Sequence, residues 1–362
     1  KLDEPESPPR DDKLRCPRHF SHPPPSPPTS SNRDWKTLIK EGFWEEFLEL
    51  LDGPMQDDDP DLFPGHTPVS ACIALVAPLD VIRQATESRP EDLSKVHPIT
   101  GRLPLHDACN PMEKLKRKYM DYRSEQVVKI VMNEYPLAIW EKDEEQETTP
   151  LHVLLQHLPS AALVQEMLDL AEILKPEGSV ELLITEDKEV QTPLHVALQY
   201  HATHDVVECL LSRASVRRAG KEGYYPLHFA VYHGCTKETL ERLLQMDAEK
   251  LVNKQNLCGE TPITLAFHPD KYAEWTKDFI AGKRLSRGDM VKILLKKVPW
   301  HFNAATKTRD TNNVIGRGAN KLTAINLGAA MKKAKLCQRI LKQQASKDLE
   351  EIVEQLKGMV RR

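Results

Sequence analysis

The chain has 362 residues, of which 40% are hydrophobic and 29% are charged, so it holds enough apolar material for a folded core. Its net charge is −4, but residues 271–362 carry 21 Lys+Arg against 8 Asp+Glu, whereas residues 1–270 carry 29 against 46. The acidic body and the basic end therefore have opposite electrostatic preferences. No stretch approaches the roughly 18 apolar residues that a membrane helix requires, so we expect no transmembrane segment.

Cysteine usage indicates the compartment. The seven Cys residues are scattered and show no close spacing, which indicates reduced thiols rather than a disulfide framework. We therefore expect an intracellular protein of the cytoplasm or nucleus. The chain begins at Lys1 without an initiator Met. The sequence therefore does not exclude an organelle-targeting segment.

The first 33 residues hold 9 of the 27 Pro residues and almost no large apolar side chains. Such a segment buries too little surface to offset its ordering entropy, so we predict a disordered arm over residues 1–33. Order is expected to begin near Asp34, an N-cap for a helix that Trp35 opens. Gly42 and the apolar positions after it, such as Phe47, predict a second helix. Residues 34–51 are therefore expected to form an N-terminal capping unit.

Six variants of one short motif follow this unit. They are Thr67-Pro-Val-Ser-Ala, Leu103-Pro-Leu-His-Asp-Ala, Thr149-Pro-Leu-His-Val-Leu, Thr192-Pro-Leu-His-Val-Ala, Tyr225-Pro-Leu-His-Phe-Ala and Thr261-Pro-Ile-Thr-Leu-Ala. Their Pro residues are Pro68, Pro104, Pro150, Pro193, Pro226 and Pro262. A degenerate copy begins at Thr323. After most copies, apolar residues recur at spacings of three and four, which predicts a second helix in each unit.

The motif resembles the ankyrin repeat, whose period is about 33 residues and whose signature is T-P-L-H-x-A. Thr caps the first helix, and Pro occupies its first position, where the missing N–H costs nothing. The resemblance implies that the His ring bonds the capping Thr and nearby backbone and so ties one repeat to the next. Four copies keep this residue: His106, His152, His195 and His228. A small residue four positions after Pro lets the helices stack: Ala108, Ala197, Ala230 and Ala266. The predicted fold is an all-α ankyrin-repeat solenoid of about eight units over residues 34–345.

Some copies depart from the motif, and these departures are expected to loosen individual junctions. Leu103 and Tyr225 replace the capping Thr, and Leu154 replaces the small residue. Ser70 and Thr264 replace His.

Irregular spacings indicate insertions, which in solenoids emerge on the surface and often contact partners. We expect them around Met112–Ser124, near Lys175–Val180, and over roughly Pro269–Asp289 with a loop at 298–321. A C-terminal amphipathic helix is predicted over residues 346–362. It either covers the end of the solenoid or contacts a partner helix.

The sequence lacks the common catalytic and metal-binding motifs. The sequence has no phosphate-binding loop, no G-x-S-x-G and no H-E-x-x-H, so we expect no enzyme and no cofactor. Cys16, His19 and His22 lack a fourth ligand at a suitable spacing, so no metal is expected. Ser286, in the sequence Lys283-Arg284-Leu285-Ser286, is a weak candidate for phosphorylation by a kinase that prefers basic residues.

Two patches are candidate partner contacts. The turns before two neighbouring motifs are acidic, so they are either merely solvated or form a groove that attracts a basic peptide. Their residues are Glu144, Glu145, Glu147, Glu186 and Asp187. The insertion with Tyr119, Tyr122 and Arg123 combines residue types that anchor interfaces.

We therefore expect a non-catalytic protein-interaction module or scaffold that binds protein partners through its concave face and inserted loops. The partner could be a basic peptide or a subunit of a larger complex. One alternative is the regulatory arm of a larger enzyme or channel. Another is a binder of nucleic acid or an anionic surface through the basic C-terminal region, although no nucleic-acid fold motif accompanies that region.

Overall fold

The computed structural model describes residues 34–51, 65–75, 77–110, 120–266, 284–285, 287–297 and 354. Within these residues every regular element is a helix, which confirms the all-α prediction. The α-helices are α1 (Trp35–Glu41), α2 (Trp44–Leu51), α3 (Pro68–Ala74), α4 (Leu79–Ser88), α5 (Pro104–Cys109), α6 (Met120–Glu134), α7 (Pro150–His157), α8 (Ala161–Leu174), α9 (Gly178–Ile184), α10 (Pro193–Gln199), α11 (His204–Leu210), α12 (Arg213–Arg217), α13 (Pro226–His233), α14 (Lys237–Leu251), α15 (Pro262–Leu265) and α17 (Arg287–Lys297). Short 3-10 helices are η1 (Pro90–Ser94), η3 (Pro136–Trp140) and η4 (Lys221–Gly223).

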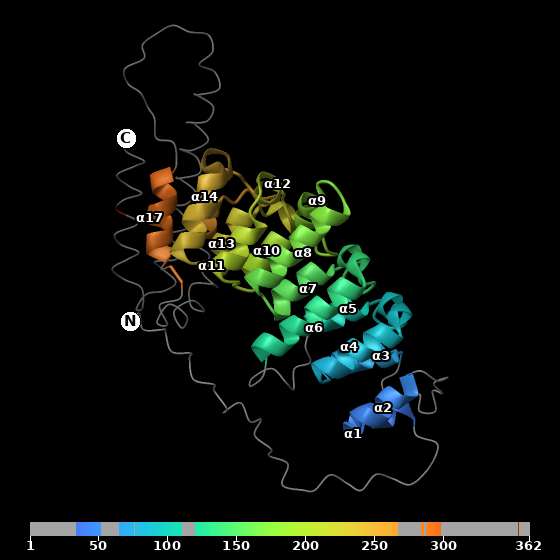
Figure 1. Cartoon of the computed structure of the whole chain (residues 1–362). Coiled ribbons are helices and arrows are strands. Elements are labelled where there is room, and N and C mark those ends of the chain that lie inside the picture. The colour runs from blue at the N-terminus through green and yellow to red at the C-terminus, as the bar shows by residue number, and fades with distance from the viewer. Residues whose placement is uncertain are drawn as a thin grey trace, which may run out of the picture.

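The helices form two rows. In the first row α3, α5, α7, α10, α13 and α15 pack one against the next, and each begins at a motif Pro. In the second row α2, α4, α6, α8, α11, α14 and α17 do the same. Figure 1 shows these pairs stacked in chain order from the blue end to the orange end. Because each pair contacts its neighbours in the stack, the architecture is a helical solenoid.

The helix starts follow from the sequence. The carboxylate of Asp34 accepts a hydrogen bond from the N–H of Lys36 at 3.2 Å, and Gly42 ends α1 in the left-handed conformation with φ 79°. The α1–α2 pair confirms helices on both sides of Gly42. The Pro at the start of each first-row helix lacks only an N–H that would have no intrahelical partner there.

The core lies between the two rows and between successive units. First-row leucines Leu105, Leu151, Leu194 and Leu227 are fully buried. They belong to the same hydrophobic cluster as buried second-row residues such as Val128, Val164, Val207 and Leu243. A continuous apolar layer therefore runs along the stack rather than a single central core.

Two insertions differ from expectation. Helix α6 begins at Met120, so residues 120–124 belong to the second helix of that unit rather than to an insertion. Near Lys175–Val180 the chain forms α9, which packs on α8 and α10, and α12 packs on α9 and α14. Neither short helix was predicted. The predicted arm over 1–33, the unit at Thr323 and, apart from Glu354, the helix over 346–362 lie outside the described residues.

Candidate protein-interaction surface

Five hairpin-like turns, here called finger turns, lead into the first-row helices from α5 onward. They cover residues 97–102, 143–148, 187–191, 220–224 and 256–260. In each, the backbone N–H of the first residue donates to the carbonyl oxygen of the last, at 2.7 to 3.0 Å. Successive fingers also touch, because Lys188 donates its N–H to Gln146 at 2.8 Å and Leu257 donates its N–H to Glu222 at 2.8 Å.

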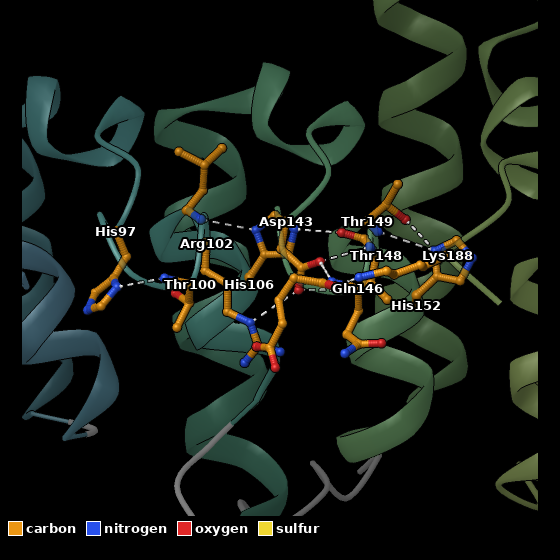
Figure 2. Close-up of polar contacts among 12 residues, drawn as sticks. His97, Thr100, Arg102, His106, Asp143, Gln146, Thr148, Thr149, His152 and Lys188 are labelled. Carbon is orange, nitrogen blue, oxygen red and sulfur yellow. Dashed lines mark hydrogen bonds and ion pairs between the residues drawn. The ribbon is translucent and has the colours of Figure 1, made fainter.

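The four motif histidines connect each unit to the following finger. In His152, Nδ1 accepts the N–H of Thr149 at 3.3 Å, while Nε2 lies 3.1 Å from the carbonyl oxygen of Gln191. His106, His195 and His228 make the same pair of contacts within their own repeats and to the next finger. Figure 2 shows the contact of His106 with Thr148 and the contact of His152 with Thr149.

This geometry requires neutral imidazoles, with the proton on Nε2 facing a carbonyl. All four rings are fully buried. Burial lowers the pKa of His106, and lowers the pKa of His152, His195 and His228 to about 4, against the weaker opposing effect of the carbonyl contacts. At neutral pH the four rings therefore serve as structural hydrogen-bonding groups.

The departures from the motif have different consequences. Leu103 and Tyr225 lack a capping hydroxyl, but each still donates its backbone N–H to the motif His at 3.2 Å. Ser70 and Thr264 make local bonds, accepting the N–H and donating to the carbonyl of the residue three positions earlier. At Ser70, where the following finger is described, these local bonds stand in place of the connection that a motif His makes to the next finger.

Asp143 organises the second finger. Its carboxylate, 1% exposed, accepts hydrogen bonds from the N–H groups of Gln146 and Thr148, each at 3.0 Å, and from the Thr148 hydroxyl at 2.9 Å. Arg102 of the first finger lies 3.2 Å away. Burial alone would raise the pKa of Asp143, but these donors together hold it below its ordinary value. The finger backbone is therefore rigidly held beneath its exposed residues (Figure 2).

The predicted acidic residues fall into two groups. Glu144, Glu145 and Glu147 are exposed on the second finger. Glu186 forms an ion pair with Arg218 at 2.7 Å, and Asp187 is half-buried and accepts the N–H groups of Glu189 and Gln191. Glu186 and Asp187 thus have contacts within the fold, and the exposed charge concentrates at residues 144–147.

In the second predicted patch, Tyr119 lies outside the described residues, and Tyr122 and Arg123 lie on α6 with side chains that are not described. The separate phosphorylation candidate Ser286 also lies outside the described residues.

Sequence reasoning missed an aromatic cluster on the fourth finger and α13. The rings of Tyr224, Phe229, Tyr232 and His233 lie 5.0 to 6.4 Å apart between centroids. Phe229, Tyr232 and His233 are spaced by three and four residues, so they lie on one side of the helix. This spacing of aromatic residues is visible in the sequence and could have predicted the cluster. The motif, however, singles out only His228 in this segment.

Stacked helix pairs, fingers and buried histidine connections define a helical-repeat protein. A family model described as ankyrin repeats, in three copies, matches residues 158–256. The chain is an ankyrin-repeat protein, and the same motif geometry recurs outside that span at His106 and His152.

Comparison with solved structures gives the crystal structure of the ankyrin repeat domain of Bcl-3, described as a unique member of the IkappaB protein family. The TM-score is 0.48 at 16% sequence identity, and the match covers 74% of this chain and 99% of that chain. No curated protein matches the sequence. In the part of the chain that the structure describes, no helix is long and apolar enough to cross a bilayer.

Proposed function

We propose that this protein is a non-catalytic interaction module that binds a basic segment of a partner protein at the second finger, through Glu144, Glu145 and Glu147. The single observation that carries the proposal is the exposure of these three carboxylates on a turn whose backbone is held by the buried Asp143. A preordered turn loses little conformational entropy on binding.

The electrostatics support a basic partner. Clustered exposed carboxylates raise the local concentration of cationic groups and accelerate their association, and this effect weakens as salt screens the charges. Lys188 contacts the second finger through its ammonium group, which donates to the carbonyl oxygen of Glu145 at 3.0 Å. This ammonium binds the backbone rather than a carboxylate, and in the described part of the chain no ion pair is formed by Glu144, Glu145 or Glu147.

The test is affinity capture from native extract with the chain as bait, beside a bait carrying Glu144→Lys, Glu145→Lys and Glu147→Lys. A matched control carries Glu87→Lys, Glu91→Lys and Glu134→Lys, which change the charge equally at exposed positions on α4, η1 and α6. We expect the finger variant alone to lose partners, and those partners to elute at raised salt. Retention of the same partners by both variants would refute the acidic finger as the site.

A further inference from the structure

The two fingers on either side of the acidic second finger each expose an apolar side chain. On the first finger Ile99 is 72% exposed, and on the third finger Val190 is 40% exposed. Neither belongs to the hydrophobic cluster that the described helices form. Single exposed apolar residues are common on protein surfaces, but these two flank the carboxylates on both sides.

Val190 also strains the backbone of its finger. Its φ of 58° lies in the left-handed region, which a β-branched residue rarely adopts. The equivalent positions of the first, fourth and fifth fingers are glycines, namely Gly101, Gly223 and Gly259. Valine at this position therefore costs the fold stability without adding to the core, as is typical of a residue that serves binding.

The first and second fingers form one continuous surface. A Cβ added at Gly101 would overlap the side chain of Glu144, so this glutamate lies directly against the first finger. The turn that carries Ile99 is held from within, because Nδ1 of His97 accepts the N–H groups of Ile99 and Thr100, each at 3.3 Å. Figure 2 shows the bond to Thr100 beside the second finger. The backbone hydrogen bond between the second and third fingers extends the same surface to the third.

The charges favour basic partner residues at the second finger rather than at its neighbours. The three exposed carboxylates of the second finger form no ion pair in the described part of the chain. The first finger contributes the positive charge of Arg102, and the third contributes that of Lys188. Glu189 of the third finger is already paired with Lys221. A cationic group is therefore attracted to the second finger, whereas the adjacent fingers offer Ile99 and an exposed valine.

We propose that the basic segment bound by the second finger is extended and carries an apolar residue on each side, one contacting Ile99 and the other contacting Val190. This inference rests on the function proposed above, to which it adds the apolar contacts and their spacing. Packed helices lie about 8–10 Å apart, and an extended chain advances about 3.3 Å per residue, so one finger corresponds to about three residues. The two apolar residues are therefore about six positions apart, with the basic residues between them.

The experiment uses the full chain and a fluorescent heptapeptide, Leu-Ser-Lys-Arg-Lys-Ser-Leu, whose binding is measured by fluorescence anisotropy. One comparison peptide has serine in place of both leucines. The other, Lys-Ser-Leu-Arg-Leu-Ser-Lys, has the same composition as the probe but brings the leucines together at its centre. We expect the probe to bind roughly tenfold more tightly than either, because it alone places a leucine on each of the two exposed apolar side chains.

Variants of the chain locate the contacts. Ile99→Ser and Val190→Gly should each weaken binding of the probe roughly threefold and leave binding of the serine peptide unchanged. Because Val190→Gly relieves backbone strain, its loss of binding cannot come from unfolding. Leu257→Ser, on the fifth finger, is the matched control, since this exposed residue also precedes a left-handed glycine by two positions. It should bind the probe normally, and a loss as large as that of Ile99→Ser would contradict the proposal.

The outcomes separate this inference from the proposed function. The variant with Glu144→Lys, Glu145→Lys and Glu147→Lys should bind neither the probe nor the serine peptide. If it behaves so, but the unchanged chain binds both peptides equally, the acidic finger is the site and the apolar contacts are overturned. If this variant binds both peptides as the unchanged chain does, or if the unchanged chain binds no peptide, the proposed function fails and this inference fails with it.

Discussion

The Nε2 atom of His106 lies 3.0 Å from the carbonyl oxygen of Thr148, a residue 42 positions farther along the chain. The same ring accepts the N–H of Leu103 through Nδ1 at 3.2 Å. One buried side chain thus satisfies a donor in its own unit and an acceptor in the next finger. Because buried backbone groups without partners are costly, these rings couple the folding of neighbouring units.

The first prediction removes one such ring. His195→Ala removes the acceptor of the buried Thr192 N–H and one of the two donors to the carbonyl oxygen of Tyr224, which keeps its bond from the N–H of Gly220. We expect a loss of about 2–3 kcal/mol in the free energy of unfolding, measured by urea denaturation. Ser70→Ala, which removes bonds within one unit only, should cost about 1 kcal/mol. Equal losses from the two changes would contradict the coupling role assigned to the histidine.

The second prediction concerns pH. The pKa values of His152, His195 and His228 are about 4 in the folded chain, below the ordinary value of about 6.5 expected after unfolding. Between these values the unfolded chain binds more protons, so acid favours unfolding. The stability contribution is fully present above about pH 6.5 and is lost as pH falls toward 4, by up to about 1.4 kcal/mol per pH unit for each ring.

Asp107 acts in the opposite direction. Burial raises its pKa to about 6, against the opposing charge of Arg102, so protonation stabilises the fold as pH falls through 6. Urea midpoints measured from pH 7.5 to 4.5 should still decline, because the lowered pKa values of four histidines outweigh the raised pKa values of Asp107 and Asp187. His152→Gln should flatten the decline and Asp107→Asn should steepen it. A midpoint independent of pH would show that the rings are charged or exposed.

The helix pairs were predictable because their signals are local. Each signal predicts structure within a single unit, as at Thr149 and His152. The signals are Pro at a helix start, His three residues after the cap, and apolar residues at spacings of three and four. The functions of the finger carboxylates were not predictable in this way. Asp143 and Asp187 bond the turn backbone while Glu144 faces outward, and sequence alone does not tell which carboxylate turns inward. The packing of α9 was also not predictable from local sequence. It depends on the close approach of Gly178 to Ala171 of α8 and Trp140 of η3.

The third prediction exploits backbone strain in the fingers. Val190 occupies the left-handed region at φ 58°, where the equivalent residues of the next two fingers are Gly223 and Gly259. A β-branched residue in this conformation costs about 1–2 kcal/mol in the folded chain. Replacement by glycine removes that strain, but glycine has more freedom in the unfolded chain, and this offsets part of the gain. Val190→Gly should therefore stabilise the protein by about 1 kcal/mol in thermal or urea unfolding.

The reciprocal change tests the same physics. Gly259 has φ 74°, and a Cβ added there would meet nothing within 4 Å. Gly259→Ala should therefore destabilise by about 1 kcal/mol through conformation alone. If Val190→Gly is neutral or destabilising while Gly259→Ala behaves as expected, side-chain contacts of Val190 outweigh its strain.

The last prediction compares one motif position in two adjacent units. Ala197 of α10 and Leu154 of α7 both occupy the small-residue position, and both are fully buried. Ala197→Leu should overpack its junction and cost about 1–3 kcal/mol. Leu154→Ala, although it restores the motif residue, should leave a cavity and cost about 2–5 kcal/mol, because the neighbouring side chains have packed around leucine. Urea denaturation measures both. If Leu154→Ala raised the free energy of unfolding, leucine would be straining the α7 junction. If Ala197→Leu left the free energy of unfolding unchanged, the packing around Ala197 would have space for a larger side chain.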